Sequence, residues 1–284
     1  MKIKKTKIIL ILFLSFIPAC NKSAQLCNCG FIEYEVTVQK QAGGFNFTEG
    51  PAADKQGNIY FTDIPNSRIL RLSIDGNLST FLENSGQANG LYFDTNGNLI
   101  ACAGGTGQLI SIDKHKTITI LADKYNSKPF NSPNDLYIHP KGGIYFTDPR
   151  YGARENLPQD GEHVYFLSPD RKRLIRVIDD MVRPNGIIGT SDGKKLYVAD
   201  HGADKTYVYT IKPDGTLLDK KLFANQGSDG MTVDEKGNVY LTKEAVTVFD
   251  STGTLLKTIE VPERPANVCF GGKDKKTLFI TAIT

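Results

Sequence analysis

Six polar residues stand at matching places along the 284-residue chain, each just ahead of a strand-like apolar run. These head residues are Glu49, Asn89, Asn134, Asn185, Asp229 and Asn267. Every one of them has a side-chain oxygen. If the fold brings them to one axis, their oxygens converge with few donors among them, which suits a hard divalent cation such as Ca²⁺. Asn and Asp also favour turns for backbone reasons alone, so the cation interpretation depends most on Glu49, which has no such preference.

The head residues belong to six similar units, whose starts lie 40, 45, 51, 44 and 38 residues apart. Each unit contains strand-like apolar runs separated by turns, often with a Gly-Asn pair, and shows no helical period. Four strands at this spacing predict an all-β fold, a six-bladed β-propeller over residues 31–284. The innermost strands of a propeller line its central channel, so this fold would gather the head residues.

The sixth unit is short, because the chain stops at Thr284 soon after its second strand. A strand from residues 33–38 can join this unit and bring the two ends of the chain together. No residues then remain for the third strand, which would leave a pairing edge unfilled. The sequence predicts either a truncated chain or a locally repaired last blade.

The first nineteen residues have the form of an export signal, with a basic head and an apolar run over residues 8–17. The sequence Ile-Pro-Ala-Cys that ends at Cys20 resembles a bacterial lipobox. We therefore expect residues 1–19 to be a lipoprotein signal peptide, Cys20 to be lipidated and residues 20–30 to be a tether. The alternative is a plain cleaved signal, in which Cys20 is lost or remains an ordinary thiol.

The overall charge excludes a nucleic-acid-binding protein. The net charge is +3, four lysines lie within the first seven residues, and no basic stripe follows them. We expect a monomeric exported lipoprotein, periplasmic or on the cell surface, that meets a membrane only through its lipid. Cys102 and Cys269 lie in apolar runs and are expected to be buried thiols.

Four histidines and a second set of recurring acids were also considered. Asp63, Asp148 and Asp200 follow the second strand of their units and are expected to cap turns, although the last two could hold an ion or water. His201 is interpreted as a surface histidine, with a substrate contact as the alternative.

Several sequence blocks are similar to those of one enzyme family. The blocks are FTEGP (47–51), FNSPND (130–135), IYFTDPRYG (144–152), RPNGI (183–187), DGKKLYVAD (192–200) and SDGMTVDEKGNVYLT (228–242). In order and spacing they resemble the gluconolactonase / senescence marker protein (regucalcin) / luciferin-regenerating enzyme family. The resemblance implies a six-bladed propeller with one divalent metal in its channel, and a lactonase that hydrolyses sugar-acid lactones such as gluconolactone.

The resemblance also implies roles for individual residues. The expected metal ligands are Glu49, Asn134, Asn185 and Asp229. Asn89 and Asn134 are expected to contact the substrate. Asp135 is expected to orient one of the metal ligands without contacting the metal itself. The metal, Ca²⁺ or alternatively Mg²⁺, Mn²⁺ or Zn²⁺, would polarise the lactone carbonyl and activate water, while Asp229 takes the proton.

Two departures from the family pattern leave other functions open. Bacterial members often have Cys-Glu-His where this chain has Cys102-Ala103-Gly104, and animal members have an arginine in place of Ser132. One alternative is a hydrolase of other esters or phosphotriesters. Another is a non-catalytic cell-surface propeller lipoprotein that binds a sugar or a protein partner.

Overall fold

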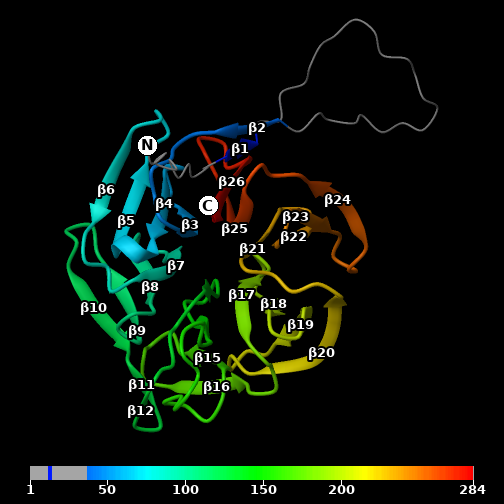
Figure 1. Ribbon diagram of the computed structural model, residues 1–284. Coiled ribbons are helices and arrows are strands. Elements are labelled where there is room, and N and C mark those ends of the chain that lie inside the picture. The colour runs from blue at the N-terminus through cyan, green and yellow to red at the C-terminus, as the bar shows by residue number, and fades with distance from the viewer. Residues whose placement is uncertain (1–11, 15–36, 284) are drawn as a thin grey trace, which may run out of the picture.

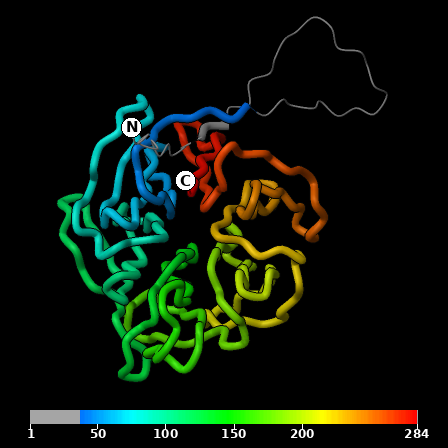
Figure 2. Tube along the Cα trace, in the orientation of Figure 1, coloured from blue at the N-terminus to red at the C-terminus, as the bar shows by residue number. Residues whose placement is uncertain are grey.

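The structure is a computed structural model that describes residues 12–14 and 37–283. Four-stranded sheets stand around a central axis, as Figures 1 and 2 show. The propeller class and the all-β composition predicted from the repeats are confirmed. The described residues contain a single short 3-10 helix, η1 (Ile64–Asn66), and no helix among them is long and apolar enough to cross a membrane.

Five blades are each made from four consecutive antiparallel strands. The first blade comprises β3 (Thr48–Ala53), β4 (Ile59–Asp63), β5 (Arg68–Leu72) and β6 (Leu78–Leu82). The second comprises β7 (Ala88–Phe93), β8 (Leu99–Ala103), β9 (Gln108–Ile112) and β10 (Ile118–Ala122). The third comprises β13 (Leu136–Ile138), β14 (Ile144–Asp148), β15 (His163–Leu167) and β16 (Leu174–Ile178). The fourth comprises β17 (Pro184–Gly189), β18 (Lys195–Asp200), β19 (Lys205–Ile211) and β20 (Leu217–Ala224). The fifth comprises β21 (Met231–Val233), β22 (Val239–Thr242), β23 (Val246–Phe249) and β24 (Leu255–Ile259).

The prediction of six such blades is wrong in its count, because only five of the described sheets have this form. The remaining four-stranded sheet is composite, in the order β2-β1-β26-β25. Its strands are β1 (Leu12–Leu14), β2 (Val38–Lys40), β25 (Arg264–Gly271) and β26 (Thr277–Ile283). Since the chain ends just after β26, the two outer places are taken by N-terminal strands, and β1 fills the third place for which the sequence shows no candidate. Residues 33–36 of the expected closing strand lie outside the described residues.

The hydrophobic core lies between neighbouring sheets. One cluster joins the second and third blades, for example through Cys102 and Phe146, and another joins the third and fourth. The composite sheet packs in the same way on both of its sides, through Ile280 against Val246 of the fifth blade and Phe279 against Phe61 of the first. The composite sheet therefore closes the ring. A small hairpin of β11 (Lys124–Tyr125) and β12 (Lys128–Pro129), which the sequence did not predict, stands outside it.

The recurring Asp and Gly-Asn residues form the turns between first and second strands. In the first blade, Asp54 Oδ1 accepts hydrogen bonds from the backbone N–H groups of Gln56 and Asn58, both at 2.9 Å. Asp54 Oδ2 accepts a third, from Asn58 Nδ2 at 2.7 Å. Gly57 has a φ of +93°, which favours glycine. The same bonds recur around Asp94 and Asp234, so this motif specifies turns.

The acids that follow the second strands also have a backbone role. Asp148 accepts hydrogen bonds from the N–H groups of Asn131 and Ser132, at 2.9 and 2.7 Å. Asp63 and Asp200 accept equivalent pairs of bonds in their own blades. The expectation that these buried residues cap turns is confirmed, and they hold the segment before each inner strand against the end of the second strand.

Glycine follows the head residue in four units because the inner strands approach one another closely. A Cβ on Gly90 would lie 2.7 Å from Asp135 Cα, and one on Gly186 would lie 2.8 Å from the carbonyl oxygen of Asp229. In the third unit the corresponding residue is Asp135, which extends a carboxylate into the space that the glycines leave. The inner ring is thus packed too tightly for further side chains at these places.

We therefore predict that Gly90→Ala destabilises the fold by roughly 1–3 kcal/mol, because the added methyl group meets backbone atoms that cannot move aside independently. The free energy of unfolding in urea measures the effect. Gly152→Ala is the matched control, since Gly152 is exposed and its nearest potential contact is the Arg150 side chain at 4.0 Å. Equal stability of the two variants would contradict the tight packing of the inner strands.

Candidate functional site

Backbone irregularities place the head residues on the inner face of the ring. In four sheets the pairing of the inner strand with its neighbour shifts register beside the head residue, as between Glu49 and Ala52 and between Pro184 and Ile187. Such bulges redirect a side chain from the regular alternation of a strand. In the other two blades the inner strands β13 and β21 begin only after Asn134 and Asp229.

Buried threonines at the ends of second strands hold this irregular backbone. Thr242 Oγ1 accepts a bond from the Gly230 N–H at 2.8 Å and lies 2.6 Å from the carbonyl oxygen of Ala266 in the next sheet. Thr147 and Thr281 make the corresponding contacts with the backbone of Asp135 and Asn267. The repeated threonine therefore bonds backbone groups beside the head residue, where the regular strand ladder has not yet begun or, at Asn267, is interrupted by a bulge.

Three carboxylates gather at the inner ring: those of Glu49, Asp135 and Asp229. Glu49 and Asp135 are buried, and Asp229 is partly buried. Burial raises the pKa of all three groups, that of Asp135 to about 7, and the charge of Asp229 raises the pKa of Glu49 further. No salt bridge to any of them exists among the described residues.

The hydrogen bonds show which carboxylate oxygens already have a donor within the protein and which do not. Asp135 uses both oxygens, since Oδ1 accepts from the Leu136 N–H at 2.9 Å and Oδ2 from the Ile187 N–H at 3.4 Å. Glu49 uses only Oε2, which accepts from the Gly50 N–H at 2.7 Å and from Asn267 Nδ2 at 2.9 Å. Within the described part of the chain, Glu49 Oε1 has no hydrogen-bond donor.

The head residues that carry amides fall into two groups. Asn267 donates to Glu49, and its Oδ1 accepts from the Val268 N–H at 2.8 Å, so both ends of this amide are occupied. The side chains of Asn89 and Asn134 receive no hydrogen bond from the described residues. Their backbones belong to the same ring, where the Gly90 N–H donates to the Asn134 carbonyl at 2.7 Å. These two amides are available to a ligand.

Asn185 joins Asp229 to a residue that the sequence did not predict for the site. Asn185 Nδ2 lies 2.6 Å from Asp229 Oδ1 and 2.6 Å from the hydroxyl of Tyr151. The guanidinium of Arg183 lies over the Tyr151 ring at 5.1 Å, and the His201 ring meets its edge at 5.9 Å. His201 is therefore close to the site. Burial raises the pKa of Asp229, and the hydrogen bond from Asn185 and the charge of Arg264 offset only part of this rise.

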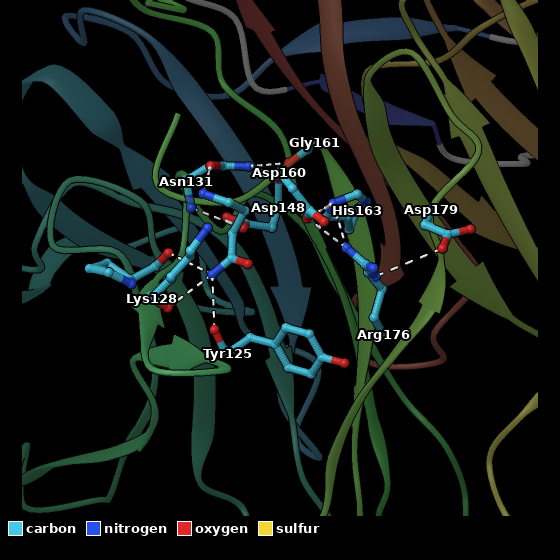
Figure 3. Close-up of polar contacts among 11 residues, drawn as sticks. Tyr125, Lys128, Asn131, Asp148, Asp160, Gly161, His163, Arg176 and Asp179 are labelled. Carbon is cyan, nitrogen blue, oxygen red and sulfur yellow. Dashed lines mark hydrogen bonds and ion pairs between the residues drawn. The ribbon is translucent and has the colours of Figure 1, made fainter. Parts of the chain in front are cut away.

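Tyr151 lies in an insertion between β14 and β15, residues 149–162. The sequence signals for the insertion are the largest unit spacing, 51 residues between Asn134 and Asn185, and the family-like block 144–152, which contains Tyr151. Figure 3 shows how the ends of this insertion are tied: Asn131 Nδ2 donates to the carbonyl oxygens of Asp148 at 3.2 Å and Gly161 at 2.8 Å. Asp160 accepts from Arg176 at 2.6 Å. The insertion is thus anchored to its own blade.

The channel continues on the far side of the carboxylates as a cavity of about 810 Å³. Asp135 and Asn267 border it, and Tyr92 and Tyr137 contribute to its walls. Glu49, Asn185 and Asp229 do not line it. Asp135 and the head residue Asn267, whose polar groups are occupied, therefore face this cavity, whereas Asn185 contacts both Asp229 and Tyr151 of the insertion.

The donor set fits an oxygen-seeking cation only if amides take part. No group of three or more His, Cys, Asp or Glu side chains in the described ranges is arranged to hold a metal ion. Glu49 and Asp229 can each supply one carboxylate oxygen, and Asn134 and Asn185 can supply amide oxygens. Mixed carboxylate and amide coordination suits Ca²⁺, and the uncompensated negative charge favours its binding. The expected lipidation site, Cys20, lies outside the described residues.

Comparison with known proteins points to one family. Residues 47–284 match the family described as SMP-30/Gluconolactonase/LRE-like region. The chain is 31% identical to a gluconolactonase of Zymomonas mobilis, over 88% of this chain and 80% of that protein. It is 27% identical to the lactonase drp35 of Staphylococcus saprophyticus, over 76% and 70% of the two chains. The structure of a gluconolactonase from Xanthomonas campestris superposes with a TM-score of 0.78 at 31% identity, covering 84% of this chain and 83% of that one.

We predict that Thr242→Val lowers the free energy of unfolding by about 1–3 kcal/mol, because the buried Gly230 N–H then loses its acceptor while the side-chain shape is kept. Urea denaturation followed by circular dichroism measures this loss. Thr252→Val serves as the control, since the Thr252 hydroxyl bonds only within an exposed turn. A variant as stable as the wild type would show that the threonine does not support the backbone beside Asp229.

Proposed function

This chain belongs to the SMP-30/gluconolactonase/LRE-like family and is a lactonase, and we propose that it hydrolyses sugar-acid lactones such as gluconolactone with a divalent cation, Ca²⁺, as cofactor. The observation that carries the proposal is the pair of acids Glu49 and Asp229, which face one channel without a salt bridge among the described residues. The protein acts as a monomer. Mg²⁺, Mn²⁺ and Zn²⁺ are the alternative cations.

Four side chains hold the proposed cation. They are Glu49, Asn134, Asn185 and Asp229. Such a cation, when bound, supplies Lewis-acid polarisation of the lactone carbonyl and lowers the pKa of water. The residues of the chain then have three tasks: to hold the lactone, to keep the ligand oxygens in place and to accept the proton of the attacking water.

Asp229 is the proposed proton acceptor. Its Oδ1 accepts a hydrogen bond from Asn185 and is the oxygen that we assign to the cation, whereas no described donor reaches its Oδ2, so Oδ2 can take the proton from water. Burial raises the pKa of Asp229, which makes this carboxylate a stronger base. Asp135 is unsuited to the task because backbone N–H groups occupy both of its oxygens, and we assign it the role of fixing the inner strands behind the ligands.

Asn89 and Asn134 are the proposed contacts to the substrate, since their amides are open to hydroxyl groups of a sugar lactone. The two departures from the family pattern lie side by side near them: Ser132 Oγ donates to the carbonyl oxygen of Gly104 at 3.2 Å. Both places carry small residues here, so the substrate pocket differs locally from that of relatives with larger polar side chains. The substrate panel must therefore include lactones of different size.

We predict that Asp229→Asn lowers kcat/KM for aldonolactones by at least about a hundredfold, because the amide cannot take a proton from water. Acid release from gluconolactone and smaller lactones, with Ca²⁺ and with chelator, measures the activity. Asp219→Asn is the control, since Asp219 is exposed in β20. Wild-type protein that binds Ca²⁺ yet hydrolyses no lactone, but cleaves aryl esters or phosphotriesters, would replace the proposed substrate class.

We further propose that the chain is exported and anchored by lipid at Cys20, on the strength of the basic head, the apolar run and the lipobox-like sequence. Cleavage before Cys20 would remove β1 and leave the mature composite sheet without the strand between β26 and β2. The anchor would place the enzyme at a membrane surface, on the periplasmic side or outside the cell.

Cys20→Ser is expected to move the protein from the membrane fraction to the soluble fraction of a bacterial host and to abolish labelling by a radioactive fatty acid. Fractionation and labelling of the full chain test this. Cys102→Ser controls for the loss of a thiol, because Cys102 is buried in the second blade. Unchanged membrane association and labelling of Cys20→Ser would exclude lipidation at that residue.

A further inference from the structure

We propose that Tyr151 is a positioning residue that fixes the amide of Asn185 so that its oxygen faces the cation. The inference rests on the cation site of the proposed function and extends it to a residue outside the head residues. It assigns a role to the insertion of residues 149–162, which has no counterpart in the other blades.

The geometry around Asn185 determines which end of its amide is occupied. Nδ2 lies 2.6 Å from Asp229 Oδ1 and 2.6 Å from the Tyr151 hydroxyl, so its two N–H groups have one acceptor each. An ionised Asp229 can only accept, and therefore the opposite amide orientation would set two oxygens against each other. In the amide orientation that places Nδ2 against both Asp229 and Tyr151, Asn185 Oδ1 is the atom left to bind a cation.

Tyr151 is held in place although it is not a core residue. Tyr151 is 47% exposed, so core packing alone does not fix its position. Arg183 covers one side of the ring, and Arg183 Nε in turn lies 3.6 Å from Glu162 Oε2, a carboxylate that is 2% exposed. Glu162 also accepts from the backbone N–H of Arg150 at 3.2 Å. The phenol is thus positioned by the anchored insertion and by the neighbouring blade.

A tyrosine phenol is neutral at physiological pH, since its ordinary pKa is about 10. A neutral hydroxyl can accept the Asn185 N–H and still keep its own proton. The same hydroxyl brings no charge that would compete with Glu49 and Asp229 for the cation. These properties suit a group that orients a ligand without being one.

Removal of this hydroxyl is expected to weaken cation binding. Tyr151→Phe keeps the ring against Arg183 and His201 but removes the acceptor, so we expect the Kd for Ca²⁺ to rise about tenfold to a hundredfold. Titration calorimetry of the full chain with calcium chloride measures Kd independently of activity. Tyr207→Phe is the matched control, because Tyr207 is a half-buried tyrosine whose ring also contacts a cation, Lys220.

A double-mutant cycle separates orientation from a general structural effect. Asn185→Ala removes the amide that Tyr151 orients, so in this background Tyr151→Phe should change Kd by less than about threefold. An equal loss of affinity in both backgrounds would show that Tyr151 acts through the fold, and the inference would be wrong. It would also be wrong if Tyr151→Phe alone bound Ca²⁺ as tightly as the wild type.

The same titrations distinguish this inference from the proposed function. If the wild-type chain binds none of Ca²⁺, Mg²⁺, Mn²⁺ and Zn²⁺, the cation site itself fails and the role of Tyr151 fails with it. If the wild type binds Ca²⁺ and Tyr151→Phe does not differ, only the positioning role is overturned. Unfolding of the metal-free variants in urea should give midpoints close to that of the wild type, as expected for a residue outside the core.

Discussion

Negative charge collected at the axis of the ring is the constraint on which the inner structure depends. Glu49, Asp135 and Asp229 lie together without a lysine or arginine partner among the described residues, and their burial raises each pKa. Buried carboxylates are tolerated when hydrogen bonds or a cation compensate their charge. Backbone N–H groups bond both oxygens of Asp135 and one oxygen of Glu49, and so compensate part of the charge of each. Glu49 and Asp229 each keep one carboxylate oxygen without a described donor. A bound cation would compensate the negative charge that remains on these two groups.

These acids can meet only if the ring of sheets is closed and narrow. Glycines, threonines and the composite sheet each contribute to that geometry. Glycines such as Gly90 and Gly186 let neighbouring inner strands touch, and threonines such as Thr242 bond the irregular backbone beside the head residues. Closure comes from the composite sheet, which packs against the first and fifth blades. Because that sheet draws strands from both ends of the chain, the site at the axis depends on residues far apart in the sequence.

The repeated features were predictable from the sequence because each is local. Turn motifs around Asp54 and their copies mark the strand boundaries, and the head residues mark the inner ring, so Glu49, Asn185 and Asp229 were placed together before the fold was known. The blade count was not predictable, since β1 occupies its place through pairing with β26 and lies within an apolar run that has the form of an export signal. Tyr151 was missed because it belongs to an insertion, where no repeat indicates what a side chain contacts.

The two sides of the polar ring differ in a way that favours one direction of substrate approach. Asp135 and Asn267 border the cavity of about 810 Å³, and the polar atoms of both are already occupied within the protein. Asn185 and Asp229 lie on the other side, beneath Tyr151, and retain open oxygens. In the proposed mechanism a lactone carbonyl comes within reach of Asp229 Oδ2, and Asp229 lies on the side of Tyr151 rather than among the residues that line the cavity. On that proposal, the insertion of residues 149–162 borders the path of the substrate as well as supporting the proposed cation site.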